Sequence, residues 1–145
     1  MSEPPALPRD QCKIDAEHIH LLAAFHFVGA GLASLGLLFL FGHYAIFHSI
    51  MDNPKLWEGQ KGGPPPVEFF QVFRWFYLIG GAWLVASGVI NVISGIFLRA
   101  RKHRMFSLIV AGLNCVHIPL GTVLGVFTLV VLMRDSVRES YDALE

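Results

Sequence analysis

Four histidine and asparagine residues are the ones best placed for chemistry, because they stand inside long apolar stretches of the sequence. They are His26, Asn91, Asn114 and His117. Neutral imidazole binds metals and haem iron and titrates near physiological pH, and either side chain is costly to leave unpaired in hydrocarbon. The four residues are therefore candidates for a proton relay, for metal or haem ligation, or for hydrogen bonds between helices. We favour the hydrogen bonds, because Asn and His commonly join helices in this way.

A haem held by two histidines requires two imidazoles that face each other at a similar depth. His26 and His117 are the nearest match, and they are the weak candidates for cofactor binding. No Asp or Glu lies in any of the three apolar stretches, although ion pumps usually rely on a carboxylate there. No cofactor is predicted, with haem or a metal kept as a less favoured alternative.

A second group of potential ligands lies near the N-terminus. Asp15, Glu17, His18 and His20 stand close together, with Cys12 nearby, and are candidates for a divalent metal at a membrane surface. Their spacing matches no specific zinc pattern. Acidic residues near a helix start also suit the helix dipole. We therefore favour a structural role for this group.

The elements that must position these residues are three stretches without Asp, Glu, Lys or Arg, at residues 18–51, 75–98 and 105–133. The chain has 145 residues, of which 54% are hydrophobic and 15% charged. A helix needs about 20 apolar residues to cross the ~30 Å hydrocarbon core of a bilayer. The sequence thus predicts an all-α integral membrane protein with three transmembrane helices, at about 18–48, 72–98 and 105–133. Residues 1–17 and 134–145 are the polar tails, and 52–71 form a loop.

Pro119 interrupts the third stretch, and two interpretations of it remain open. Each half of a hairpin would reach only about 20 Å, and one small, polar stripe keeps helical spacing across the proline. These arguments favour one helix kinked at Pro119. The alternative is a re-entrant helical hairpin, which would return Arg134 and Arg138 to the side of the other basic residues. The stripe consists of Ser107, Ala111, Asn114, Gly121, Gly125 and Thr128.

Orientation follows from the positive charges of residues 99–104, which form the densest basic cluster of the chain. Basic loops stay on the cytoplasmic side, so this loop and the N-terminal tail are predicted there. Loop 52–71 then faces outward. It contains the stiff segment 62–66, and its ligand-binding role is less favoured than a plain linker with aromatic residues at headgroup level. Those aromatic residues are Trp57, Phe69, Phe70, Trp75 and Tyr77.

Helices in lipid associate where small residues let their backbones approach closely. The sequence offers several such positions, and internal packing is the favoured use, with a surplus left for a membrane-protein partner or a homo-oligomer. The net charge of +0 gives no basic field for nucleic acid. Cys12 and Cys115 are predicted to be free thiols. The predicted packing residues are Gly29, Ala33, Gly36, Gly81, Gly88, Gly95, Gly121 and Gly125.

Segments 18–27 and 105–133 resemble a widespread group of small, uncharacterised bacterial inner-membrane proteins. The most specific part is Pro-Leu-Gly-Thr-Val-Leu-Gly at 119–125, followed by Arg-x-Ser-Val at 134–137. The group tends to have histidines at positions 18 and 26, but the chain departs from it at Asn114 and His117, where relatives look acidic and aromatic. The resemblance implies residence in a bacterial inner membrane and no known activity, substrate or cofactor.

These observations predict a non-enzymatic membrane protein that acts as an accessory or scaffold subunit. Packing faces are plentiful and catalytic signatures scarce: no phosphate-binding glycine loop, nucleophile elbow or paired zinc motif occurs. One alternative is an oligomeric transporter or channel that uses the His and Asn layer. The other is a membrane redox protein that binds haem or a metal. The lipid bilayer is a partner under each of these hypotheses.

Overall fold

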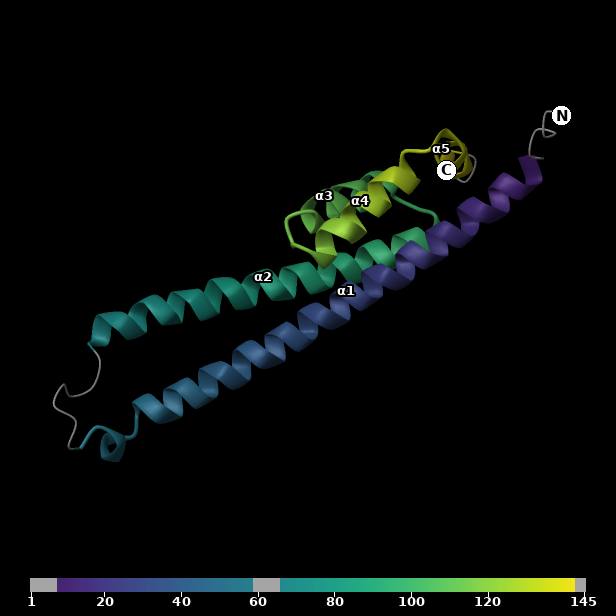
Figure 1. Cartoon of the computed structure of the whole chain (residues 1–145). Coiled ribbons are helices and arrows are strands. Elements are labelled where there is room, and N and C mark those ends of the chain that lie inside the picture. The colour runs from purple at the N-terminus through teal and green to yellow at the C-terminus, as the bar shows by residue number, and fades with distance from the viewer. Residues whose placement is uncertain (1–7, 59–65, 143–145) are drawn as a thin grey trace. The chain divides into compact units, whose positions relative to one another are not determined.

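The computed structural model describes residues 8–58 and 66–142 of the chain (Figure 1), and within these ranges it contains helices and no strands. Residues 62–65 of the predicted stiff segment lie outside the described residues. Two helices, α1 and α2, are long and apolar enough to cross a membrane, and a third span is counted if α4 and α5, bent by 71°, are taken together. The all-helical prediction is thus confirmed, with two or three candidate spans. The elements are α1 (Pro8–Met51), the short 3-10 helix η1 (Pro54–Leu56), α2 (Val67–Ala100), α3 (Arg104–Asn114), α4 (Leu120–Leu132) and α5 (Asp135–Asp142).

The described chain divides into two compact units. Unit 1 contains residues 8–30 and 89–142, which include α3, α4, α5 and one end of both α1 and α2. Unit 2 contains residues 31–58 and 66–88, which include η1 and the other ends of α1 and α2. Both long helices therefore contribute to both units, and the candidate site residues fall in unit 1.

In unit 1, α1 and α2 approach closely at Gly95. A Cβ atom at this position would lie 3.0 Å from the ring of Phe27 and 3.3 Å from the Ala23 carbonyl oxygen, so a side chain has little room. The apolar core of the unit lies nearby and includes two residues of α5. Its buried members are Ile19, Leu22, Ala23, Leu98, Val131, Leu132, Val137 and Tyr141.

The third apolar stretch is a helical hairpin, so the favoured prediction of one helix kinked at Pro119 is wrong. α3 ends at Asn114 and α4 begins at Leu120, and Figure 1 shows the two helices side by side. The Arg104 Nε atom donates to the Leu132 carbonyl oxygen at 2.8 Å, which joins the first residue of α3 to the last of α4. The turn is closed by the amide of His117, which donates to the Asn114 carbonyl oxygen at 2.9 Å.

The same small residues that suggested a continuous helix explain the hairpin. A Cβ at Gly125 would meet the Ala111 carbonyl oxygen and lie 2.6 Å from the Cys115 Sγ atom, so α3 and α4 approach at backbone distance. A Cβ at Gly121 would likewise lie 2.6 Å from the Asn114 carbonyl oxygen. The stripe thus forms two faces that pack on each other. Pro119 has no N–H to continue a helix, which suits the break.

The polar tails are more helical than the sequence predicted. α1 begins at Pro8 rather than at residue 18, and Asp135–Asp142 form α5, whose Val137 and Tyr141 side chains are buried. Residues 1–7 and 143–145 of the predicted tails lie outside the described part. Four-residue spacing places Val137 and Tyr141 on one face of a helix, so burial of that face holds the C-terminal segment in the fold.

Unit 2 is a pair of helix ends joined by aromatic contacts. His43 Nδ1 and the Tyr77 hydroxyl lie 2.7 Å apart. The rings of Phe47 and Phe73 stack with centroids 5.2 Å apart, and Tyr44 meets Tyr77 edge-on at 5.1 Å. We call these five residues the aromatic cluster. Two of the residues predicted at headgroup level, Phe69 and Tyr77, contact other aromatic rings in this unit, whereas Trp75 is exposed.

The predicted packing glycines that have described neighbours are used inside the two units. A Cβ at Gly29 would lie 3.6 Å from Asn91 Oδ1, one at Gly36 would lie 3.3 Å from a Leu84 methyl carbon, and one at Gly81 would lie 3.7 Å from a Leu40 methyl carbon. Ala33 and Gly88 are half-buried. Gly31, Gly42 and Gly112, in contrast, have open space where a Cβ would stand.

Candidate functional site

Four buried polar side chains form a hydrogen-bonded network in unit 1, with one residue from each of the helices α1 to α4. We call His26, Asn91, Asn114 and Thr128 the polar network. His26 and Thr128 are 0% exposed, Asn91 is 5% exposed and Asn114 is 4% exposed. The helix packing at Gly29 and Gly95 brings α1 and α2 together, and the hairpin brings Asn114 and Thr128 to the same place.

The two asparagines form a reciprocal pair. Asn91 Nδ2 donates to Asn114 Oδ1 at 3.1 Å, and Asn114 Nδ2 donates to Asn91 Oδ1 at 2.8 Å. His26 Nδ1 also lies 2.9 Å from Asn91 Oδ1. Since an amide oxygen only accepts hydrogen bonds, this contact assigns a proton to His26 Nδ1. Asn91 thus binds both of its network neighbours.

The other ring nitrogen of His26 faces Thr128. The Thr128 hydroxyl donates to the Leu124 carbonyl oxygen at 2.8 Å, and its oxygen lies 3.3 Å from His26 Nε2. A hydroxyl has one hydrogen, and the shorter bond to Leu124 uses it. The contact between the Thr128 oxygen and His26 Nε2 is therefore the weaker of the two. Both ring nitrogens face protein groups and His26 is 0% exposed, so this arrangement joins four helices and leaves no open position on His26 for a ligand.

The structure does not bring His117 into the polar network. His117 is half-buried and lies in the turn between α3 and α4, where its amide and its carbonyl bond to Asn114 and Thr122. The suggested pairing of His26 with His117 around a haem does not match this geometry, because His26 directs its two nitrogens to Asn91 and Thr128. The break at Pro119 is the physical reason, since it places His117 in a turn instead of along a helix.

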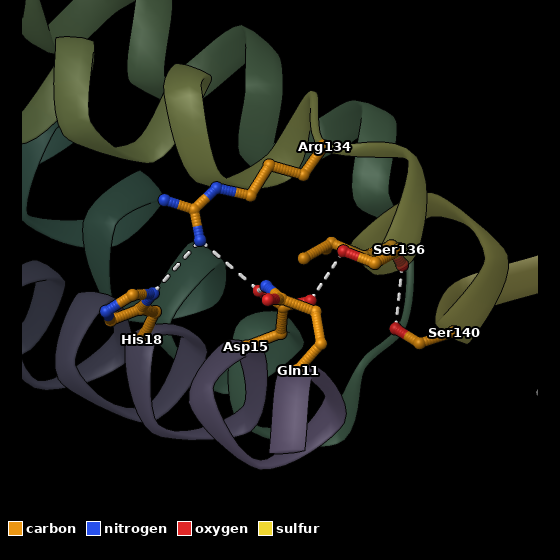
Figure 2. Close-up of polar contacts among 7 residues, drawn as sticks. Gln11, Asp15, His18, Arg134, Ser136 and Ser140 are labelled. Atoms are coloured by element: carbon orange, nitrogen blue, oxygen red, sulfur yellow. Dashed lines mark hydrogen bonds and ion pairs between the residues drawn. The ribbon is translucent and has the colours of Figure 1, made fainter. Parts of the chain in front are cut away.

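A second polar group, which we call the polar anchor, ties the start of α1 to the C-terminal segment. It consists of Gln11, Asp15, His18, Arg134 and Ser136. Figure 2 shows Asp15 between its donors: Arg134 Nη1 donates to Oδ1 at 3.2 Å and Ser136 Oγ to Oδ2 at 2.6 Å. Gln11 Nε2 donates to Oδ1 at 3.1 Å. Arg134 Nη1 also lies 3.2 Å from His18 Nδ1.

Asp15 precedes the uncharged stretch of α1, and its surroundings stabilise the carboxylate. Burial by itself would raise the pKa of Asp15. Hydrogen bonds from Ser136, Gln11 and Arg134, together with the positive charge of Arg134, hold this pKa below its ordinary value of 3.8. Asp15 is therefore ionised at neutral pH. Both carboxylate oxygens accept hydrogen bonds from protein groups, so Asp15 acts as an anchor for the C-terminal segment.

The predicted metal ligands are not gathered into one site. Asp15 binds Arg134 and Ser136, whereas Glu17 and His20 are exposed. Across residues 8–58 and 66–142, no group of three or more His, Cys, Asp or Glu residues could hold a metal ion. Cys12 and Cys115 are free thiols, as predicted.

Sequence reasoning missed several residues that the structure brings to these two groups. Thr128 belonged to the small, polar stripe, but nothing in its spacing showed that it would meet His26. Arg134 and Ser136 appeared as tail residues, although each binds Asp15. The spacing of Val137 and Tyr141 was the available signal, because two apolar residues four apart in a polar segment indicate an amphipathic helix that packs on something.

Comparison with protein-family models, with curated proteins and with solved structures gives no match for this chain.

Proposed function

We propose that this protein is a small multi-pass protein of a bacterial inner membrane and acts as a non-enzymatic accessory or scaffold subunit of a membrane complex. The observation that carries the proposal is the closed polar network. Its side chains come from four helices and bind one another, which is the arrangement expected of hydrogen bonds that hold helices together. A transport path or a haem site would instead direct such groups to a cavity or an open ligand position. In this proposal the protein functions through the surfaces by which it contacts other subunits.

The proposed topology has α1 and α2 as membrane spans and α3 with α4 as a hairpin that enters and leaves on one side. α3 has 11 residues and α4 has 13, lengths of about 17–20 Å at helical rise, too short to cross a ~30 Å core alone. This topology gathers most of the basic residues and both polar tails on one side of the membrane, and the positive-inside rule favours the cytoplasm for that side. The basic residues on that side are Arg9, Lys13, Arg99, Arg101, Lys102, Arg104, Arg134 and Arg138.

Labelling of single cysteines in intact cells tests this topology. Cys12 and Cys115 are first replaced by serine, and one cysteine is then introduced at Lys55, Ala100 or Glu139, all of which are exposed. An impermeant thiol reagent should label position 55 only, and all three positions should react after the cells are opened. Labelling of position 139 in intact cells would contradict the hairpin topology. Labelling of position 100 would show that the orientation is the opposite of the one proposed.

The accessory role is tested by purification from native membranes in a mild detergent. We expect a stoichiometric membrane-protein partner that is lost when outward-facing Gly31 or Gly112 is replaced by leucine. These two positions have no neighbour within 4 Å of a Cβ, so the variants should fold. Asn91→Leu is the matched control, since it weakens the interior and leaves the surface unchanged. A homogeneous protein without a partner, together with ion flux in liposomes, would overturn the accessory role in favour of transport.

A further inference from the structure

A pocket of about 470 Å³ opens where α3 begins, in unit 1 and apart from both polar groups described above. Its walls come from the end of α2, from the start of α3 and from α5. The walls combine three apolar side chains with basic and polar ones. The lining residues are Phe97, His103, Arg104, Met105, Phe106, Tyr141 and Asp142.

Tyr141 lines this pocket and carries a buried hydroxyl. Tyr141 is 2% exposed, and in the part of the chain that the structure describes its hydroxyl has no hydrogen-bond partner. A buried hydroxyl without a partner costs free energy, so such groups normally bind protein atoms or a ligand. A phenol is a good donor to an anionic oxygen. The described protein groups therefore leave the donor hydrogen of the Tyr141 hydroxyl unused, and a ligand oxygen would satisfy it.

The backbone at the pocket adds further donors. Arg101 and His103 have φ values of 50° and 49°, in the left-handed region. His103 is the N-cap of α3 and makes no side-chain capping hydrogen bond. The amides of Phe106 and Ser107 donate to the His103 carbonyl oxygen, which leaves those of Arg104 and Met105 at the open end of the helix. A helix N-terminus with such free amides favours an anion.

Positive charge surrounds the same place. Arg101 and Arg104 lie close enough to act electrostatically on Tyr141, and Lys102 stands between them in the sequence. Asp142 is the opposing charge in the lining. Arg104 keeps its Nε atom on the Leu132 carbonyl oxygen, which fixes the guanidinium beside the pocket. Within the lining, Arg104 and Asp142 carry opposite charges, and Arg101 adds positive charge beside the pocket, so the surroundings favour an anion.

We propose that this pocket binds the phosphate group of an anionic phospholipid. Phosphate supplies acceptors for the Tyr141 hydroxyl, the guanidinium groups and the first amides of α3. The apolar walls favour a lipid over free phosphate, because Phe97 and Phe106 pack edge-on at 5.3 Å and Met105 is 66% exposed, a surface for the glycerol and acyl groups. The inference uses the membrane placement proposed above and is independent of the accessory role.

The test uses the full-length protein in lipid nanodiscs and in detergent. Retention of phosphatidylglycerol is compared with that of phosphatidylcholine by native mass spectrometry, and inorganic phosphate is titrated into the detergent sample without lipid. We expect phosphatidylglycerol to be retained preferentially. Tyr141→Phe should weaken it about 3–10-fold, and Arg101→Gln about 5-fold. Tyr44→Phe and Arg138→Gln remove the same groups away from the pocket and should change nothing.

A stability measurement separates the binding role from a structural one. Because the Tyr141 hydroxyl has no protein partner, Tyr141→Phe should leave the lipid-free melting temperature unchanged or higher and should abolish most of the increase that phosphatidylglycerol produces. Equal retention of both lipids, or unchanged phosphatidylglycerol binding in Tyr141→Phe, would overturn the proposal. Saturation by inorganic phosphate without any lipid preference would overturn the lipid as the ligand. Loss of membrane insertion would instead contradict the proposed topology.

Discussion

The two units of the chain are stabilised by different kinds of contact. Unit 1 has an apolar core, the polar network and the polar anchor, and its buried side chains include His26, Asn91 and Thr128. In unit 2, Ser87 is the one described residue with a buried side chain, and the members of the aromatic cluster are half-buried or exposed. Both units contain segments of the same two helices. Helix sequence alone therefore does not decide which part has a packed interior.

The difference shows what a third and a fourth helix contribute. Two helices in contact bury one face each, and their other faces must meet lipid or a partner. The hairpin of α3 and α4 adds the faces needed to enclose polar side chains, which are costly in lipid unless they are paired. We therefore expect substitutions in unit 1 to act through the protein interior and those in unit 2 to have small effects on folding.

The largest effect is expected from Gly125→Ala. The added Cβ meets the Ala111 carbonyl oxygen and Cys115, which are fixed in the facing helix, so the hairpin must open. We expect the free energy of unfolding, measured in mixed micelles, to fall by about 3 kcal/mol. Gly112→Ala is the matched control, because its Cβ has open space, and it should be neutral or stabilising by up to about 1 kcal/mol. Equal effects at the two glycines would contradict the close packing of α3 on α4.

Asn91→Leu should have the next largest effect. It removes the reciprocal pair with Asn114 and the acceptor of His26 Nδ1, leaving buried donors unpaired. We expect a loss of about 2 kcal/mol, with membrane insertion retained. Asn114→Leu combined with Asn91→Leu should cost less than the sum of the single changes, because the two residues bind each other. Additive losses would show that the network is not a unit.

A smaller and pH-dependent effect is expected at the polar anchor. The pKa of Asp15 is lower in the folded protein than its ordinary value of 3.8, so its contribution to stability is present above about pH 4 and is lost as the pH falls through the folded value. Asp15→Asn should destabilise by about 1 kcal/mol at pH 7. The variant should also lose less stability than the wild type between pH 5 and pH 2. A pH dependence identical to that of the wild type would contradict the anchor.

Tyr77→Phe should have the smallest effect. The bond between His43 and Tyr77 is short, but it is exposed in unit 2, and the aromatic contacts of the ring remain after the change. We expect less than about 0.5 kcal/mol. Tyr44→Phe, which removes a hydroxyl from the same cluster, is the control. A loss as large as that of Asn91→Leu would show that unit 2 also depends on buried polar bonds.

The sequence was informative about helices and much less informative about their partners. Uncharged stretches separated by basic or proline-rich segments are sufficient to predict an all-helical membrane protein, because the hydrocarbon core demands long apolar helices. His26, Asn91 and Asn114 were predicted to form hydrogen bonds between helices, and the structure joins them in this way. That prediction needed only their polar side chains and their positions within apolar stretches.

What the tertiary structure decided was the course of the chain after Asn114 and the identity of the remaining partners. A stripe of small residues has the same spacing whether it lies along one helix or on two facing helices, so local pattern does not distinguish a kink at Pro119 from a hairpin. Thr128 near His26 and Arg134 beside Asp15 are contacts between residues more than a hundred positions apart. Such pairs depend on how helices fold back on one another. The sequence by itself determined the apolar helices and the polar residues they contain, and only packing determined which of those residues meet.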